Sequence, residues 1–345
     1  MGRVEEWFGR HVPDAAAPLS FHQIAGGHSN LTFEVTDRDG RRFVLRRPPL
    51  GHRLASAHDM GREFRLISAL AGTEVPVPKA FGHCDDDEIT GAEFYVMGFI
   101  DGHVIRDRTA AETHLNVDAR ARSSESIVDT LAALHSIEPA DVGLGDLARH
   151  EGYIERQLKR WYGQWTQQHT RELPEIDATH QILLGAIPPQ GPARLVHGDY
   201  RLDNCMVDDT GNVVAVLDWE ICTLGDPLAD LGLLMVYWTG PDDAESAWDS
   251  GATTPEGFWN RAALAERYGA VTGRDLSDLG FYEAFAYWKL ACILEGVYAR
   301  YLGGALGERD PGELALFAQR VEAAATKAHG LASQLANTRP TGDRS

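Results

Sequence analysis

One stretch of the sequence, residues 195–220, constrains the fold more than any other. Two short apolar runs rich in β-branched residues, 205–207 and 213–217, flank the segment 208–212, whose Asp-Asp-Thr-Gly-Asn sequence is typical of a turn. We therefore expect a β-hairpin here. Polar residues stand just before and just after the hairpin, so its open end is where a functional site could form.

The paired strands should bring polar side chains together at this open end. If Val207 pairs with Ala215, Asn204 lies opposite Asp218 across the ladder. An amide oxygen beside a carboxylate suits a hard divalent cation such as magnesium. Asp199, on the loop that leads into the first strand, could accept a proton from a substrate hydroxyl. The stretch therefore predicts a catalytic base, Asp199, beside two metal ligands, Asn204 and Asp218.

The same residues follow the H-x-D-x-x-x-x-N order, with a later aspartate, that is described for kinase-type phosphoryl transfer. Such a transfer relies mainly on positioning and electrostatics, so a base, two metal ligands and a phosphate-binding loop supply most of what it needs. Taken singly, each residue is more simply explained as a cap of a loop or of a hairpin end. Found together and in order around an apolar hairpin, they favour a catalytic site.

Composition limits the kinds of partner. The net charge of −19 argues against a nucleic-acid partner, because no basic stripe could neutralise a run of phosphates. The four cysteines are far apart and form no C-x-x-C pair, which argues against a zinc site and against a disulfide scaffold. The N-terminus lacks an apolar leader, and no apolar run reaches membrane-spanning length. We expect a cytoplasmic enzyme without a nucleic-acid partner and without a membrane-spanning segment.

Upstream of residue 195 the chain begins with a strand pattern. Segments 31–35 and 43–46 are joined by Asp39–Gly40, which is a strong hairpin signal. The loop before them could lay backbone N–H groups along the phosphates of a nucleotide. This loop lacks the full G-x-G-x-x-G pattern, and its residues are Gly27, His28, Ser29 and Asn30.

A second phosphate contact is predicted from Arg46 and Glu63. Arg46 ends the strand 43–46, and Glu63 lies on a helix expected over residues 58–70. A basic strand residue paired with a helical Glu is how kinases hold the α- and β-phosphates. Arginine here replaces the usual lysine; its guanidinium binds phosphate bidentately, although the replacement is not neutral.

A buried strand over residues 94–97 leads to the segment 98–102, a natural boundary between a β-rich and a helical part. Backbone groups at such a junction could meet an adenine edge, and Met97 and Phe99 could pack on its faces. The predicted organisation is an N-terminal extension (1–20), an N-lobe with the phosphate cradle (21–102), a helical C-lobe with the catalytic loop and acceptor pocket (103–335) and a disordered tail (336–345).

Several residues of the helical part have simple structural explanations. An apolar stripe at helical spacing is expected to be core rather than a substrate platform, and it comprises Ile154, Leu158, Trp161 and Trp165. Off this stripe lies a basic cluster of Arg156, Lys159 and Arg160. Asp226 and Asp230 are expected to be a helix cap and a first-turn carboxylate favoured by the helix dipole.

With these residues in place, the chain resembles the aminoglycoside phosphotransferase (protein-kinase-like) superfamily over nearly its whole length. It is most similar to the branch that also occurs as the kinase-like domain of acyl-CoA dehydrogenase family members ten and eleven. The matching segments are 26–32, 43–49, 94–97, 197–204, 216–220, 223–230, 289–296 and 298–300.

The resemblance implies an α+β fold of two lobes, with a small antiparallel β-sheet in the N-lobe and a larger, mostly helical C-lobe. It implies that ATP and magnesium are used to phosphorylate a hydroxyl of a small molecule. The implied roles are Asp199 as base, Asn204 and Asp218 as magnesium ligands, Arg46 supported by Glu63 as the phosphate contact, and Gly27 to Asn30 as the cover of the triphosphate.

The resemblance also bears on the acceptor. Asp218-Trp219-Glu220 stands where protein kinases have D-F-G, and no A-P-E segment follows, which argues against an activation loop and a protein substrate. For the animal relatives the implied substrates are hydroxyacyl-CoA thioesters, which would need a basic patch such as the cluster 156–160. An aminoglycoside or amino alcohol would instead need acidic residues at the pocket mouth.

Two other classes of protein remain open from the sequence. A nucleotide-binding pseudokinase or regulatory module is suggested by Arg46 and by the incomplete glycine loop, although the intact polar set argues against it. A metal-dependent hydrolase built on His197 and the aspartates would leave Arg46 and Glu63 unexplained.

Overall fold

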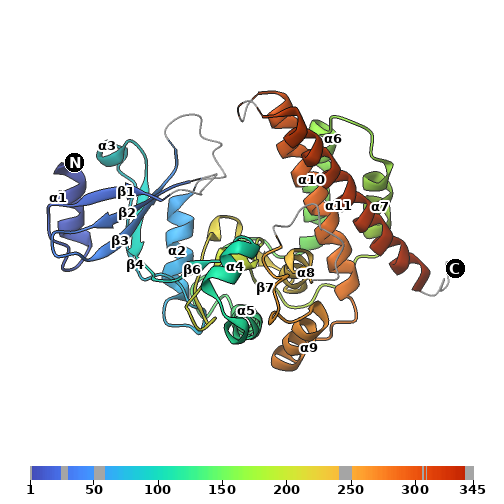
Figure 1. Ribbon diagram of the computed structural model, residues 1–345, viewed down its shortest axis with the longest axis horizontal. Helices are drawn as coiled ribbons and strands as arrows, with labels where there is room; N and C mark the ends of the chain where they lie inside the picture. Colours follow the sequence, from blue (N-terminus) through green and yellow to red (C-terminus); the bar gives the residue numbers. More distant parts are fainter. Residues whose placement is uncertain are drawn as a thin grey trace.

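The computed structural model describes residues 2–24, 30–49, 59–240, 251–304, 307 and 309–338. The chain forms two lobes that meet near residues 98–103. Figure 1 shows the two lobes side by side. The first lobe is an antiparallel sheet with helices packed on it, and the second is mostly helical. The two-lobed α+β fold expected from the resemblance is therefore confirmed.

The first lobe is built on a five-stranded sheet with strand order β1-β2-β3-β5-β4. Each neighbouring pair of its strands is antiparallel, and the predicted hairpin is formed by β2 and β3. In chain order its elements are α1 (Gly2–His11), β1 (Ser20–Gln23), β2 (Leu31–Thr36), β3 (Arg42–Arg47), α2 (Met60–Leu70), β4 (Ala80–Cys84), α3 (Asp87–Thr90) and β5 (Phe94–Gly98).

Alternation along β3 divides this lobe into two cores, because successive strand side chains point to opposite faces. Phe43 belongs to a core with Trp7 of α1 and Phe94, and the rings of Trp7 and Phe94 are 4.8 Å apart. Val44 belongs to the other core, with α2. Arg46, two residues on, shares the face of Val44, and both line the space between this lobe and the second one. Residues 1–20, which were expected to be an N-terminal extension, thus contain helix α1, and α1 contributes to the core around Phe43.

The second lobe surrounds two small sheets, β6-β8-β9 and β10-β7, with long helices. No helix in the described part of the chain is both long and apolar enough to cross a membrane. In chain order its elements are β6 (His103–Val104), α4 (Arg108–His114), α5 (Val117–Ser136), α6 (Tyr153–Gln168), α7 (Pro174–Gly185), β7 (Arg194–Val196), η1 (Leu202–Asn204), β8 (Cys205–Val207), β9 (Val213–Val216), η2 (Trp219–Ile221), β10 (Thr223–Gly225), α8 (Leu228–Tyr237), α9 (Arg261–Thr272), α10 (Leu279–Leu302) and α11 (Pro311–Thr338).

Strands β8 and β9 form the predicted central hairpin, but the expected register is wrong. Met206, not Val207, pairs with Ala215, and the pairing of β8 with β9 is irregular between Met206 and Val207. The backbone oxygen of Asn204 accepts the N–H of Leu217 at 2.8 Å, so Asn204 lies opposite Leu217 rather than the residue after it. Most residues of both strands are buried, so the apolar pattern does not single out one register.

The turn of this hairpin depends on a glycine. Gly211 has φ +91°, and a Cβ at this position would overlap the backbone oxygen of Ala119 in α5. Gly211→Ala is therefore expected to lower the free energy of unfolding by about 2–4 kcal/mol, measured by urea denaturation. Gly143→Ala is the control, because Gly143 has φ +73° but open space around it. It should lose only about 1–2 kcal/mol, and an equal loss in both variants would contradict the close approach to α5.

Helix α9 begins at Arg261, because the Asn260 side chain accepts the N–H of Ala263 at 2.9 Å and caps the helix there. Helix α11 continues to Thr338, into the segment expected to be disordered. The rest of that segment, residues 339–345, lies outside the described residues.

Candidate active site

Asp199 lies on the loop that follows β7, and a buried carboxylate holds this loop in place. Asp230, in the first turn of α8, accepts the backbone N–H groups of His197 at 2.6 Å and Gly198 at 2.8 Å. His135 of α5 lies 3.3 Å from the same carboxylate. Burial opposes ionisation of Asp230, but hydrogen bonds from His135 and the backbone outweigh it and hold the pKa below its ordinary value. Expected only to be a first-turn carboxylate, Asp230 fixes the loop that carries Asp199.

His197 connects this loop to the loop that carries Asp218. Its ring is fully buried, and Nε2–H donates to the backbone oxygen of Leu217 at 2.9 Å. A carbonyl oxygen can only accept, so Nδ1 is the acceptor, and it receives the N–H of Asp199 at 3.3 Å. Both ring nitrogens are therefore used inside the protein, which removes His197 as a ligand for the hydrolase alternative.

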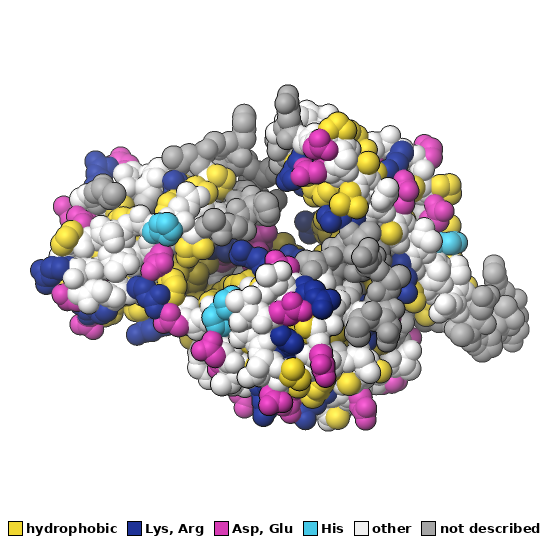
Figure 2. Space-filling view, viewed as in Figure 1, with side chains coloured by type: hydrophobic (Ala, Val, Ile, Leu, Met, Phe, Trp, Pro, Cys, Tyr) yellow, Lys and Arg dark blue, Asp and Glu magenta, His cyan; other side chains and the backbone are white. Residues whose placement is uncertain are grey.

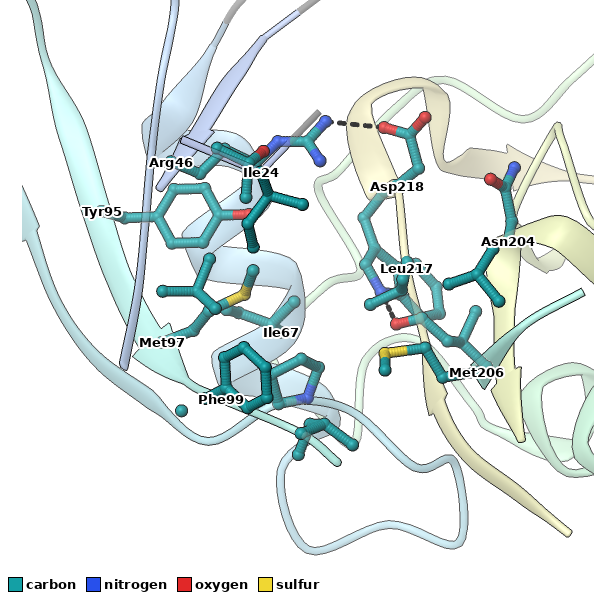
Figure 3. Close-up of a pocket in the computed structure, with 18 of the residues that line it drawn as sticks. Ile24, Arg46, Ile67, Tyr95, Met97, Phe99, Asn204, Met206, Leu217 and Asp218 are labelled. Atoms are coloured by element: carbon teal, nitrogen blue, oxygen red, sulfur yellow. Dashed lines mark hydrogen bonds and ion pairs between the residues drawn. The ribbon is translucent and has the colours of Figure 1, made fainter. Parts of the chain in front are cut away.

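Asn204 contacts Asp199 despite the shifted register, and Asp218 and Asn204 line the same space between the lobes. The side-chain nitrogen of Asn204 donates to a carboxylate oxygen of Asp199 at 2.9 Å and to its backbone oxygen at 2.8 Å. Asp218 has φ 64° and ψ 63°, a left-handed conformation that is uncommon for a residue with a side chain. Figure 3 shows the side chains of Asp218 and Asn204 projecting into the space between the lobes. The three predicted polar residues are thus brought together.

Arg46 and Glu63 form the expected pair between a strand and a helix. Arg46 Nε lies 3.1 Å from Glu63 Oε2, and the Tyr95 hydroxyl donates to the same carboxylate at 2.9 Å. Burial raises the pKa of Glu63, and the charge of Arg46 opposes this rise. Arg46 Nη2 also contacts Asp218 Oδ1 at 2.7 Å, drawn as a dashed line in Figure 3. Arg46 therefore links the first lobe to the loop of the predicted metal ligand.

The loop predicted to cover a triphosphate is only partly described. Gly27, His28 and Ser29 lie outside the described residues, whereas Asn30 is described. The Asn30 side-chain nitrogen donates to Glu63 Oε1 at 3.3 Å. The end of this loop thus reaches the ion pair of Arg46.

A cavity of about 320 Å³ separates the two lobes. Figure 2 shows a hollow at this place, with Lys and Arg side chains inside it. In the close-up of Figure 3, Met97 and Phe99 lie along the first lobe and Met206 faces them from β8. Arg46 and the polar groups of the second lobe stand at the other end of the cavity. An apolar slot with a charged end has the shape and chemistry to take an aromatic base joined to phosphates.

Glu220 is a carboxylate to which the sequence pattern assigned no role. Its Oε2 accepts the Asn30 amide at 3.4 Å and lies 3.9 Å from Arg46. Burial, followed by the nearby charge of Asp218, raises the pKa of Glu220 to about 7. Crowded carboxylates of this kind are stabilised by a bound cation. The donor set of Asn204 and Asp218, with Glu220 alongside, therefore fits magnesium.

A second pocket, of about 260 Å³, lies on the C-lobe side of Asp199. Among the described residues that line it, Asp199 is the only carboxylate, against three cationic side chains, Arg160, Arg201 and Lys289. Arg201 Nε lies 3.3 Å from Asp199 Oδ2 and 3.1 Å from Asp203 Oδ1. The pocket beside the candidate base is therefore basic.

The apolar stripe of α6 divides between the core and this pocket. Its buried members are Ile154, Leu158 and Trp165. Trp161 is half-buried, and it packs against the core as expected while it also lines the second pocket. The basic cluster divides too, because Arg160 lines the pocket whereas the Arg156 guanidinium donates to the backbone oxygens of Glu151 and Arg149.

Four residues of the site had no functional role in the sequence-based prediction. Arg201 lies inside the H-x-D-x-x-x-x-N segment, and Glu220 two residues after Asp218, so the motif itself could have drawn attention to both. Asp230 and Lys289 lie on α8 and α10, far along the chain from Asp199. Only the packing of helices brings these two to the loop.

Comparison with known proteins agrees with this geometry. A model of the phosphotransferase enzyme family matches residues 20–285. Acyl-CoA dehydrogenase family member 11 of Gallus gallus is 33% identical over 346 residues, which cover 97% of this chain and 44% of that protein. Acyl-CoA dehydrogenase family member 10 of Mus musculus is 32% identical, over 84% of this chain and 27% of that protein. The chain thus spans less than half the length of these relatives.

Solved structures with the same fold include a Ralstonia eutropha protein described as an aminoglycoside phosphotransferase. It is 31% identical, with a TM-score of 0.79 over 96% of this chain and 98% of that one. The phosphotransferase APH(4)-Ia, solved with AMP-PNP and hygromycin B, is 15% identical with a TM-score of 0.60 over 99% and 100% of the two chains, and it shows the fold alone. Because the family match runs from β1 into α10, the chain belongs to the phosphotransferase enzyme family.

Proposed function

We propose that this chain is an ATP- and magnesium-dependent phosphotransferase that acts on a hydroxyl group of a small molecule. The observation that supports this most strongly is that Asp199, which lines the basic pocket, is hydrogen-bonded to a residue of the cleft. Asn204 and Asp218 line the cleft between the lobes, and Asp199 lines the basic pocket on its other side. The hydrogen bond from Asn204 to Asp199 connects the two. A base at such a junction can meet an acceptor hydroxyl from one side and a phosphoryl donor from the other.

Each side chain then has a definite role. Asp199 takes the proton of the acceptor hydroxyl as the new oxygen–phosphorus bond forms. Arg46, oriented by Glu63, binds phosphate oxygens, and Arg201 beside Asp199 can neutralise charge on the transferring phosphoryl group. The remaining proposed contacts are Asn204 and Asp218 with magnesium, Met97 and Phe99 with the base of the nucleotide, and Gly27, His28, Ser29 and Asn30 with the triphosphate. Bound magnesium would supply positive charge against the phosphate oxygens.

A hydroxyacyl-CoA is the acceptor class that we favour. The curated relatives carry acyl-CoA dehydrogenase names, and their kinase-like part is the part that this chain matches. The pocket beside Asp199 has three cations and one carboxylate, which suits an acceptor that carries phosphate or acyl oxygens. An aminoglycoside or amino alcohol would bring ammonium groups against the same three cations, at a cost in affinity.

The test is a screen of acceptors with the purified chain, ATP and magnesium, in which a product that has gained a phosphate is detected by mass spectrometry. We expect transfer to hydroxyacyl-CoA thioesters and little or none to aminoglycosides or amino alcohols. Transfer to the amines alone would replace the proposed acceptor class, and transfer to no member of the panel would count against the phosphotransferase activity itself.

A pseudokinase is the alternative that one observation favours. Arg46 Nη2 contacts Asp218 Oδ1 at 2.7 Å, so one oxygen of a proposed metal ligand is already used within the protein. A regulatory module would bind nucleotide without transferring phosphate. In the same screen it would give no product, while ATP would still raise the melting temperature whether or not magnesium is present.

A further inference from the structure

We infer that Lys289 selects the acceptor by holding an oxygen of its acyl or carboxyl group, which places the acceptor hydroxyl at Asp199. The inference rests on the proposed phosphotransferase function and adds to it the side chain that recognises an acid derivative. Lys289 lies on α10, and neither the hairpin nor the kinase-type motif includes it.

The position of Lys289 ties it to the catalytic loop. Its ammonium donates to the backbone oxygen of Gly198 at 3.1 Å, and Gly198 immediately precedes Asp199. Lys289 and Asp199 line the same pocket. A ligand oxygen bound by Lys289 would therefore lie close to the candidate base.

The ammonium of Lys289 has capacity for a ligand. It carries three N–H donors, and Gly198 takes one of them. Among the residues that the structure describes, Asp199 and Asp230 act on Lys289 through their charge and not through a hydrogen bond. Burial lowers the pKa of Lys289, and the charges of Asp199 and Asp230 oppose this only from a distance. A desolvated cation of this kind is stabilised by a carboxylate or carbonyl oxygen.

The rest of the pocket fits an acyl chain better than a sugar. The indole of Trp161 lies near two cations, with its ring centroid 5.5 Å from Lys289 Nζ and 5.0 Å from Arg160 Cζ. Leu233 and Ile293 add apolar surface. Arg160 is exposed, so a more distant anionic group of the acceptor could meet it at the pocket mouth. The pocket thus offers a base for a hydroxyl, a cation for an acyl oxygen and an apolar wall for the carbons between them.

The test compares three acceptors that share one hydroxyl-bearing chain: 4-hydroxypentanoyl-CoA, 4-hydroxypentanoate and 5-aminopentan-2-ol. For wild type we expect the thioester and the carboxylate to be preferred over the amine. Lys289→Met keeps the length of the side chain and removes its charge. It should raise KM for the two acid derivatives about 10- to 100-fold, the usual value of a hydrogen bond to a charged group, with a smaller change in kcat. The KM for the amine should fall or stay unchanged.

Two further variants isolate the effect. Lys289→Arg restores the charge and should restore most of the preference for acid derivatives. Lys327→Met removes an exposed lysine on α11, which lines neither cavity, and should leave all three acceptors unchanged. Melting curves of each variant establish that it is folded, and Lys289→Gln replaces Lys289→Met if the latter is not.

The outcomes separate the two proposals. Equal losses of kcat/KM for all three acceptors in folded Lys289→Met would mean that Lys289 only positions Gly198, and the inference would be overturned. If wild type transfers phosphate to none of the three, the phosphotransferase proposal fails instead. In that case a binding measurement tests whether Lys289 holds the acceptor. 4-hydroxypentanoyl-CoA without ATP should raise the melting temperature of wild type but not of Lys289→Met. An equal rise in both would overturn the inference on its own.

Discussion

Asp199→Asn is expected to lower kcat for phosphoryl transfer by about 10²- to 10⁴-fold, which is the usual contribution of a positioned general base. The amide keeps the shape of the carboxylate and can still accept the hydrogen bond from Asn204, so the loop should stay in place. It cannot take up the proton of the acceptor hydroxyl. The loss is measured as phosphorylated product formed per unit time under saturating ATP and magnesium.

Nucleotide binding should survive this change, because Asp199 lines the pocket opposite the cleft. A rise in melting temperature with ATP and magnesium, equal to that of wild type, would establish this. Asp209→Asn is the matched control, since Asp209 is exposed on the hairpin turn and contacts His103. It should keep full activity. Full activity in Asp199→Asn as well would remove Asp199 as the base.

The polar groups of the site could be predicted because local structure places them. Asp199 and Asn204 share one loop, and Asp218 follows the strand that pairs beside Asn204, so a few short-range contacts determine their proximity. The pair of Arg46 and Glu63 was predictable for a similar reason, since each residue lies on a regular element with a known facing side. An error of one residue in register did not separate these groups.

Features that depend on packing between distant helices could not be predicted. Asp230 looked like a helix-dipole carboxylate because its partners at residues 135 and 197–198 are far away in sequence. Trp161 has the spacing of a core residue, yet the turn of α6 that carries it faces the catalytic loop. Helix α1 was expected to be an extension, because nothing local indicates that Trp7 packs on the sheet. In each case the role of the residue depends on contacts with parts of the chain that are distant in the sequence.

Removal of the Asp230 carboxylate is expected to have the largest effect on stability. Asp230→Ala would leave the N–H groups of His197 and Gly198 buried without their acceptor, and it would remove the partner of His135. Loss of one partner from a buried charged network costs about 3–5 kcal/mol in the free energy of unfolding. Urea denaturation at 25 °C measures this loss. Because the same N–H groups hold the loop of Asp199, activity should fall even where the variant remains folded.

Asp226→Asn separates a general loss of stability from release of the loop. Asp226 is also buried, but it accepts from the N–H of Leu228 and the hydroxyl of Tyr282 rather than from the catalytic loop. We expect this variant to be less stable than wild type while it keeps kcat at a temperature where it is folded. Asp230→Ala should lose kcat under the same conditions, since the position of Asp199 depends on His197 and Gly198. If the two variants were equally stable and equally active, Asp230 would be a structural carboxylate like Asp226, and the loop would be held by other contacts.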